Sequence, residues 1–155
     1  MEDATIPDDE VVDPGGRDGC RAPIPWTRVD PHGWIGEVPW LPWAPHSADR
    51  SVEAMRENPS SILHLYKRII AARAASRALT LGSIELLTTP DDILGYERFD
   101  EASGDRRVML INFGDRQVLT PGYQGTKIEV DSASKMDGDA FDGVMAPGSA
   151  VILAP

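Results

Sequence analysis

Residues able to bind or polarise a ligand gather near the start of the chain, where two glycines precede Arg17, followed closely by Asp18 and Arg21. A guanidinium presents a planar fork of donors, which suits either a carboxylate or two neighbouring sugar hydroxyls. An arginine after two glycines is more often a surface residue, so Arg17 alone leaves a binding and a surface role open. Asp18 and Arg21 are interpreted as loop-structural residues that make charge-assisted hydrogen bonds.

Four tryptophans follow within the next stretch of chain, at Trp26, Trp34, Trp40 and Trp43. An aromatic face offers apolar area to the C–H groups of a sugar ring, and it also packs well against protein. Packing of the loop is the favoured interpretation for each tryptophan, and Trp26 is assigned a loop-structural role.

Neither the histidines nor the acidic turns have the spacing of a metal site. His32, His46 and His64 do not follow a zinc-ligand pattern. Residues 137–139 read Asp-Gly-Asp but lack the closing glutamate of a calcium loop, so they are interpreted as a surface turn. Cys20 is the single cysteine, which excludes an intrachain disulfide. We therefore expect no metal and no cofactor.

Composition narrows the classes of partner. The chain has 155 residues, a formal net charge of -10 and 41% hydrophobic residues. An acidic chain is a poor ligand for nucleic acid or anionic membrane, because phosphate binding needs a basic surface. The acidic N-terminus does not resemble a secretory signal, and no apolar run reaches the length of a membrane span. The expected location is cytoplasmic.

The elements that would position these residues fall into three stretches. Residues 1–50 are rich in proline and tryptophan and show no sustained hydrophobic periodicity. This composition predicts an irregular arm that is ordered by packing on another part of the protein. Residues 51–57 predict a short turn of helix capped by Ser51. Asn58 and Pro59 then predict the start of a long amphipathic helix over residues 59–77, with apolar side chains at helical spacing.

From Gly82 onward the pattern predicts short strands separated by turns rich in proline, glycine and aspartate. The expected fold is therefore mainly β, with an antiparallel β-sandwich preceded by the arm and one long helix. The predicted strands are Ser83–Thr88, Ile93–Phe99, Arg107–Asn112, Gln117–Thr120, Ile128–Asp131 and Ala150–Leu153.

Five segments in register resemble one enzyme family, the α-glucosidases and oligo-1,6-glucosidases of glycoside hydrolase family 13, in the α-amylase superfamily. Residues 16–26 (GRDGCRAPIPW) resemble the family's GRDxxRxPMxW segment. Gly33-Trp34 matches an aromatic loop position, and residues 39–42 match PWLP. Residues 58–63 (NPSSIL) and 66–73 (YKRIIAAR) resemble the family's last helical segments.

The resemblance implies the C-terminal part of an enzyme with a (β/α)₈ barrel followed by a β-sandwich called domain C. Residues 1–50 would be the loop after the eighth barrel strand, residues 51–80 the last barrel helix, and residues 81–155 domain C. A complete barrel needs about 250 residues. The chain is therefore expected to hold only the end of one.

The family's chemistry is retaining hydrolysis of α-glucosidic bonds by two carboxyl groups about 5 Å apart. The resemblance places these carboxylates upstream, and Asp8, Asp9, Glu10 and Asp13 match none of them. No catalytic residue is therefore assigned, and the isolated chain is expected to be inactive. By the same resemblance Arg17 would line the glucose pocket of a complete enzyme.

Two classes of function remain open. In the first, the chain is part of an enzyme and associates through the helix at 59–77, with a second copy or with a separate barrel chain. In the second, it is a stand-alone carbohydrate-binding or protein-interaction module. The strands carry few aromatics and no planar platform, which favours the first.

Overall fold

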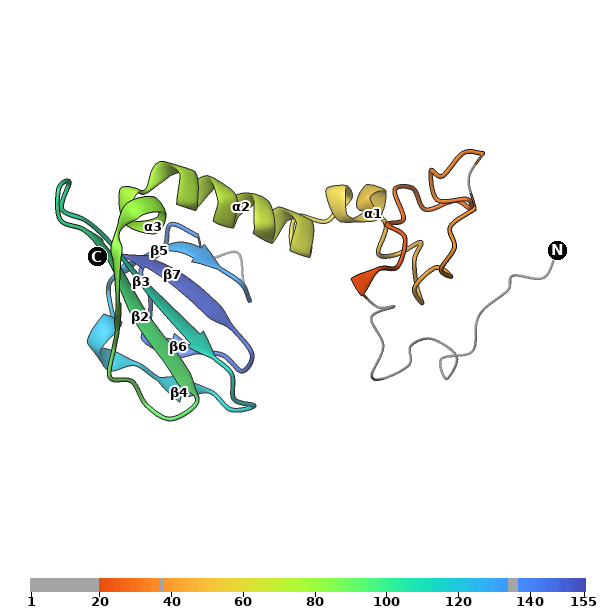
Figure 1. Ribbon diagram of the computed structural model, residues 1–155. Coiled ribbons are helices and arrows are strands. Elements are labelled where there is room, and N and C mark those ends of the chain that lie inside the picture. The colour runs from red at the N-terminus through yellow and green to blue at the C-terminus, as the bar shows by residue number, and fades with distance from the viewer. Residues whose placement is uncertain (1–19, 37, 134–136) are drawn as a thin grey trace. The chain divides into compact units, whose positions relative to one another are not determined.

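The computed structural model describes residues 20–36, 38–133 and 137–155 and divides the chain into two compact units, Met1–His64 and Leu65–Pro155 (Figure 1). The first unit is largely irregular in its described part, as predicted for the arm. The second unit holds all the described strands. No helix among the described residues is long and apolar enough to cross a membrane.

The first unit contains a short helix, α1 (Val52–Glu57), whose cap was predicted correctly. Ser51 is fully buried, and its hydroxyl accepts a hydrogen bond from the amide of Ala54 at 3.1 Å. The same hydroxyl donates to the carbonyl of Ala48 at 2.8 Å. One serine therefore fixes both the start of α1 and the path of the chain that enters it.

The prediction of one long helix over residues 59–77 is wrong. Asn58 is the C-cap of α1 and does not start the next helix; α2 (Ile62–Ala75) starts four residues later. α2 ends before Ser76, whose extended backbone (φ -112°, ψ 125°) separates it from α3 (Arg77–Leu81). The Ser76 hydroxyl accepts from the amide of Leu79 at 3.1 Å and so caps α3.

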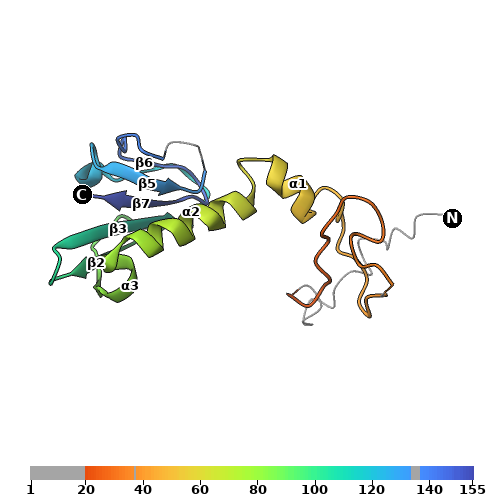
Figure 2. The same cartoon turned by 90° about the horizontal axis from the view of Figure 1, so that it is seen from above.

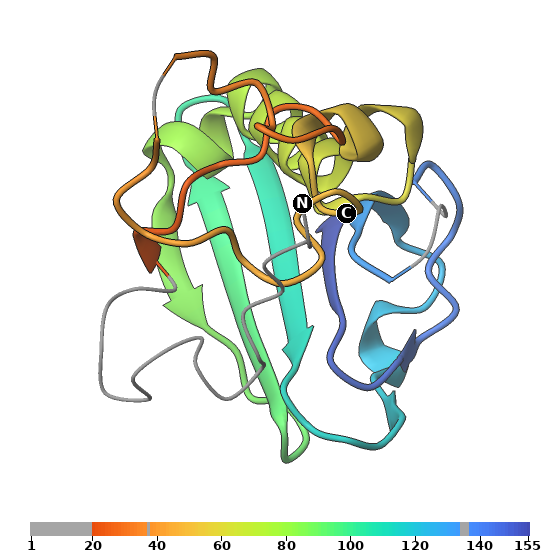
Figure 3. The same cartoon turned by 90° about the vertical axis from the view of Figure 1, so that its right-hand side faces the viewer.

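The strands of the second unit form two antiparallel sheets, so the fold is mixed, with helix and sheet, where the sequence predicted mainly β. The larger sheet has the order β1-β2-β3-β7-β5, and Figure 3 shows these strands side by side; β4 and β6 form the smaller sheet. All six predicted strands are present, and β6 is additional. Their bounds are β1 (Ser83–Leu86), β2 (Ile93–Asp100), β3 (Asp105–Asn112), β4 (Val118–Leu119), β5 (Lys127–Asp131), β6 (Val144–Met145) and β7 (Ala150–Ala154).

The five-stranded sheet buries apolar side chains on both faces. Neighbouring residues of β3 point to opposite sides: Val108 and Leu110 join the core that includes Met145 of β6, whereas Met109 joins the core under α2. In β5 the register shifts between Ile128 and Val130. In a regular strand, residues i and i+2 face the same side of the sheet. Because of the irregularity, Ile128 packs in one core and Val130 in the other.

α2 packs on the sheet with only part of its apolar surface (Figure 2). Leu65 and Ala72 belong to the core with Met109, and Arg68 binds Asp137 across the same side at 2.7 Å. Ile62, Tyr66 and Ile70 are more than half exposed. The predicted apolar stripe is thus divided into a covered side and an uncovered side.

Candidate functional site

Two of the predicted site residues, Arg17 and Asp18, lie outside the described residues. Arg21 and Trp26 are described, in the arm that leads to α1. The guanidinium carbon of Arg21 lies 4.6 Å above the ring centre of Trp40, a cation–π contact on the surface. Trp26 is about half exposed, and its backbone amide donates to the carbonyl of His32 at 2.9 Å.

The organising residue of this arm is His32, which the sequence interpretation treated only as a non-ligand. Its side chain is buried, with 7% exposure. The ring Nδ1 lies 2.8 Å from the carbonyl oxygen of Thr27, and Nε2 lies 3.0 Å from the hydroxyl of Ser47. Because a carbonyl only accepts, Nδ1 donates to Thr27, and Nε2 makes the hydrogen bond with the hydroxyl of Ser47.

The tryptophans pack around this histidine. Trp43 meets the ring of His32 edge-on at 4.7 Å and the ring of Trp34 at 6.1 Å. The indole of Trp34 donates to the carbonyl of Ile24 at 2.9 Å. Gly33 has φ +86°, and a Cβ there would lie 2.9 Å from Cβ of Trp26, so the turn requires glycine.

The arm is attached to α1 by backbone and charge. The amide of Val52 donates to the carbonyl of Pro25 at 2.9 Å, and that of Glu53 donates to the carbonyl of Trp26 at 3.1 Å. Arg28 reaches Glu57 at 2.6 Å, and this hydrogen bond raises the pKa of the guanidinium. These bonds join the two ends of a loop, described over residues 24–36 and 38–53, and the buried side chain of His32 holds its interior.

This loop presents surface aromatics and a cation that can contact a ligand. Trp40 is 71% exposed. Among the described residues, no three histidine, cysteine or carboxylate side chains lie together as metal ligands. The exposed aromatic and cationic side chains of the described arm suit recognition of a ligand.

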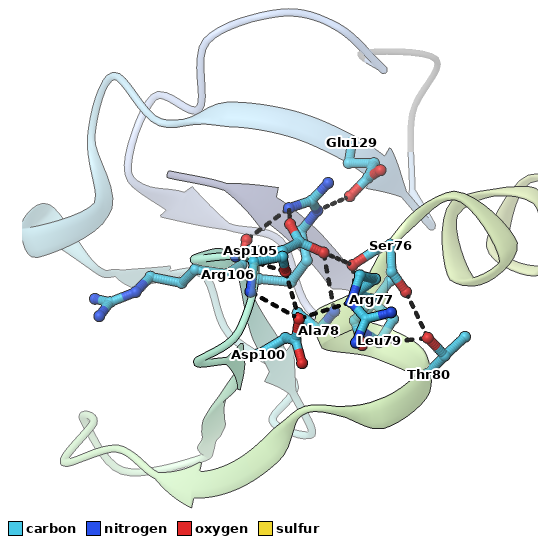
Figure 4. A network of polar contacts seen from close by, with 11 residues as sticks. Ser76, Arg77, Ala78, Leu79, Thr80, Asp100, Asp105, Arg106 and Glu129 are labelled. Atoms are coloured by element: carbon cyan, nitrogen blue, oxygen red, sulfur yellow. Dashed lines mark hydrogen bonds and ion pairs between the residues drawn. The ribbon is translucent and has the colours of Figure 1, made fainter.

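The second unit contains a dense cluster of carboxylates, but its members are held in structural roles (Figure 4). Asp105 accepts from the Ser76 hydroxyl at 2.6 Å and from the amide of Ala78 at 2.9 Å, and it pairs with Arg107. The Ser76 hydrogen bond and the Ala78 amide lower the pKa of Asp105 to about 2. A carboxyl group with so low a pKa cannot act as a general acid near neutral pH.

Asp100, directly opposite Asp105 where β2 turns into β3, is held in the same way. Arg77 donates to it at 2.8 Å, and this hydrogen bond, with one from the Ser103 hydroxyl, lowers the pKa of Asp100. Arg107 also binds Glu129 on β5. These contacts fasten α3 to β2 and β3, and β3 to β5, so the cluster is a structural junction.

A comparison of sequences identifies the family. A sequence model of the α-amylase catalytic domain matches residues 2–82, just over half of the chain. The chain belongs to the α-amylase family of glycoside hydrolases. The predicted relationship to α-glucosidases and oligo-1,6-glucosidases is confirmed.

Two relatives show how much of the family is present. A probable α-glucosidase of Rhizobium meliloti is 38% identical over 101 residues, which are 64% of this chain and 18% of that protein. An oligo-1,6-glucosidase of Parageobacillus thermoglucosidasius is 28% identical over 101 residues, 65% of this chain and 18% of the relative. The chain thus spans about a fifth of the length of these relatives.

The fold also occurs in a solved structure. The trehalulose synthase MutB from Pseudomonas mesoacidophila superimposes with a TM-score of 0.75 at 22% identity, covering 90% of this chain and 26% of that one. At this identity the likeness concerns the fold alone.

Proposed function

We propose that this chain is the C-terminal part of an α-glucosidase that hydrolyses α-glucosidic bonds with retention. Residues 1–50 supply the loop after the last barrel strand, residues 51–80 the last helical segment of the barrel, formed by three helices and not one, and residues 81–155 a β-sandwich of the domain C type. The match of residues 2–82 to the catalytic-domain model carries this proposal. The folded loop around His32 supports it, because a loop that lines a pocket must hold one shape.

In the complete enzyme Arg17 binds the glucose unit that enters the pocket. Its guanidinium pairs with a carboxylate from the barrel and presents the remaining donors to sugar hydroxyls. Asp18, Arg21 and Trp26 maintain the loop. The contact between Arg21 and Trp40 is the described interaction that supports this structural role for Arg21.

The Arg17 proposal is tested in a chimera in which this chain replaces the corresponding segment of the Rhizobium meliloti relative. We expect the chimera to hydrolyse a nitrophenyl α-glucoside and Arg17→Ala to raise KM about tenfold or more, because a buried carboxylate loses its partner. Arg28→Ala, which removes only a surface pair with Glu57, is the matched control. Equal KM values for the two variants would contradict the proposal that Arg17 lines the glucose pocket.

By itself the chain has no glucosidase activity, because the family's nucleophile and acid are supplied by the part of the barrel that precedes the matched segment. We expect the purified chain to show no turnover of a nitrophenyl α-glucoside above the buffer rate. Detectable turnover that survives repeated purification contradicts this proposal. The same preparation, titrated with maltose and starch, tests the alternative of a carbohydrate-binding module, which predicts saturable binding.

The uncovered side of α2 is the surface that meets the rest of the barrel, supplied by the same protein or by a separate chain. Tyr66 and Ile70 are 61% and 62% exposed there. Exposed apolar side chains at helical spacing are typical of a surface that packs on another element. When no barrel is present, the same side is available for association of two copies through the helix.

A further inference from the structure

One pair of side chains in the arm has the geometry of an activated nucleophile. The hydroxyl oxygen of Ser47 lies 3.0 Å from Nε2 of His32, and the other ring nitrogen, Nδ1, lies 2.8 Å from the carbonyl oxygen of Thr27. A nucleophile within hydrogen-bond reach of a base, with the base oriented by a third group, is the arrangement that enzymes use for covalent catalysis. The three groups lie at positions 27, 32 and 47, so folding of the loop brings them together.

The carbonyl of Thr27 selects the form of the ring that can act as a base. Because Nδ1 donates to this carbonyl, the lone pair of the neutral ring lies on Nε2, the nitrogen that faces Ser47. The ring can therefore take the proton of the Ser47 hydroxyl. Its orientation is held by packing as well, since the ring is buried and Trp43 meets it edge-on at 4.7 Å.

The hydroxyl can be reached although its base is buried. His32 is buried, whereas Ser47 is half-buried and lies in the turn that leads into α1. The backbone amides of Ser47 and Ala48 make no hydrogen bond with any part of the chain that the structure describes. Unused amides at a nucleophile are the kind of donor that stabilises the oxyanion formed when a carbonyl is attacked.

We propose that Ser47 is a nucleophile that takes the acyl group of an ester, with His32 as its general base. The Ser47 oxygen bonds to the ester carbonyl carbon while its proton passes to Nε2 of His32. The bond from this carbon to the alcohol oxygen then breaks, the proton moves from the ring to the departing alcohol, and the acyl group stays on Ser47. Water, activated by the same nitrogen, hydrolyses the acyl-serine and restores the hydroxyl.

The surroundings of the pair indicate the class of ester. The base lies against the indole of Trp43, which in turn meets Trp34 at 6.1 Å. An aromatic wall beside the reacting atoms favours an uncharged ester with an apolar or aromatic group. The inference does not depend on the proposed glucosidase function, because retaining glycoside hydrolysis uses two carboxyl groups and neither Ser47 nor His32.

The test is the reaction of the full chain with an alkyl fluorophosphonate, whose phosphorus is attacked by an activated serine with loss of fluoride. Tryptic digestion and mass spectrometry locate the adduct, because residues 29–50 form one tryptic peptide in which Ser47 is the single serine. We expect Ser47 to be labelled about 100-fold faster than the exposed Ser60, the low end of what a general base contributes. With 4-nitrophenyl acetate, the same serine should carry the acetyl group as 4-nitrophenolate is released.

Three variants complete the test. Ser47→Ala should abolish labelling of the peptide 29–50, and His32→Gln, which keeps a donor for Thr27 but removes the base, should slow labelling about 100-fold. His46→Asn, which replaces the exposed histidine next to Ser47, should leave the rate unchanged.

The inference is overturned if Ser47 is labelled no faster than Ser60, or if His32→Gln and His46→Asn label at the wild-type rate. Labelling of the peptide 29–50 that persists in Ser47→Ala also overturns it. Should His32→Gln fail to fold by tryptophan fluorescence, the rates at Ser47 and Ser60 within the wild-type chain decide alone, because both serines then meet the same probe under the same conditions.

Discussion

Asp105→Ala is expected to destabilise the second unit by about 3 kcal/mol, because it leaves several polar partners unpaired at once. The carboxylate of Asp105 accepts from the Ser76 hydroxyl and the Ala78 amide and pairs with Arg107 (Figure 4). Its removal releases the first turn of α3 from the hairpin. Urea unfolding of the full chain, followed by far-ultraviolet circular dichroism, measures the loss.

Asp105→Asn removes the negative charge of the side chain but keeps its size, so it measures the contribution of the charge. The folded-state pKa of Asp105 is lowered to about 2, below the unfolded value of about 3.9. The charged form therefore stabilises the fold above about pH 4, and this contribution is lost as the pH falls toward 2. Allowing for partial exposure of the side chain, it amounts to about 1–2 kcal/mol.

The expected difference between wild type and Asp105→Asn is thus largest near neutral pH and shrinks in acid. Asp115→Asn, at a side chain that is 97% exposed, is the matched control and should follow the wild type at every pH. A constant difference between the wild type and Asp105→Asn from pH 7 to pH 2 would contradict the assigned role of the charge.

The same junction shows why the helix boundaries could not be predicted. Residues 59–77 have apolar spacing and good helix formers, and the only local sign of a break after Ala75 is the single capping serine, Ser76. The break depends on Asp105, which is 29 residues from Ser76 and accepts from its hydroxyl. Periodicity reports local propensity, whereas a cap supplied from a distant strand is visible only in the fold.

The strands were easier to predict, because the alternation of apolar and polar residues and the turn residues between strands are local features of the sequence. β6 was missed because Val144 and Met145 form a strand of two residues, too short to show a period. Likewise, the apolar residues of α2 were recognised, but not their division between Leu65 on the sheet and Tyr66 and Ile70 in the open. The spacing of apolar residues along a helix does not determine how much of the apolar surface the sheet covers.

For the candidate site, the family could be predicted from motifs in the sequence, and the family match confirms the family. The role of His32 could not be predicted from the sequence, because a single histidine does not indicate which residues will form hydrogen bonds with it. Its positive φ of 53° and its place between Pro31 and Gly33 are the local signs of a tight turn. The contacts with Thr27 and Ser47 require the loop to close over 15 residues, which no short motif encodes.

His32→Asn is expected to destabilise the first unit by about 2–3 kcal/mol. The shorter side chain leaves the carbonyl of Thr27 and the hydroxyl of Ser47 without the ring and opens a gap beside Trp43. All four tryptophans lie between residues 26 and 43, so tryptophan fluorescence reports this unit selectively. The fluorescence transition in urea should move to lower concentration.

His46→Asn is the matched control, because both histidines have positive φ, 53° and 58°, and asparagine tolerates this conformation. His46 is exposed, so its replacement should leave the transition unchanged. The circular dichroism transition of the sheet should stay in place for both variants, since both histidines belong to the first unit and the sheet to the second. Equal shifts of the fluorescence transition for both variants would mean that the turn conformation, and not the buried imidazole, stabilises the loop. The arrangement of Arg21 and Trp26 would then depend on contacts other than those of His32.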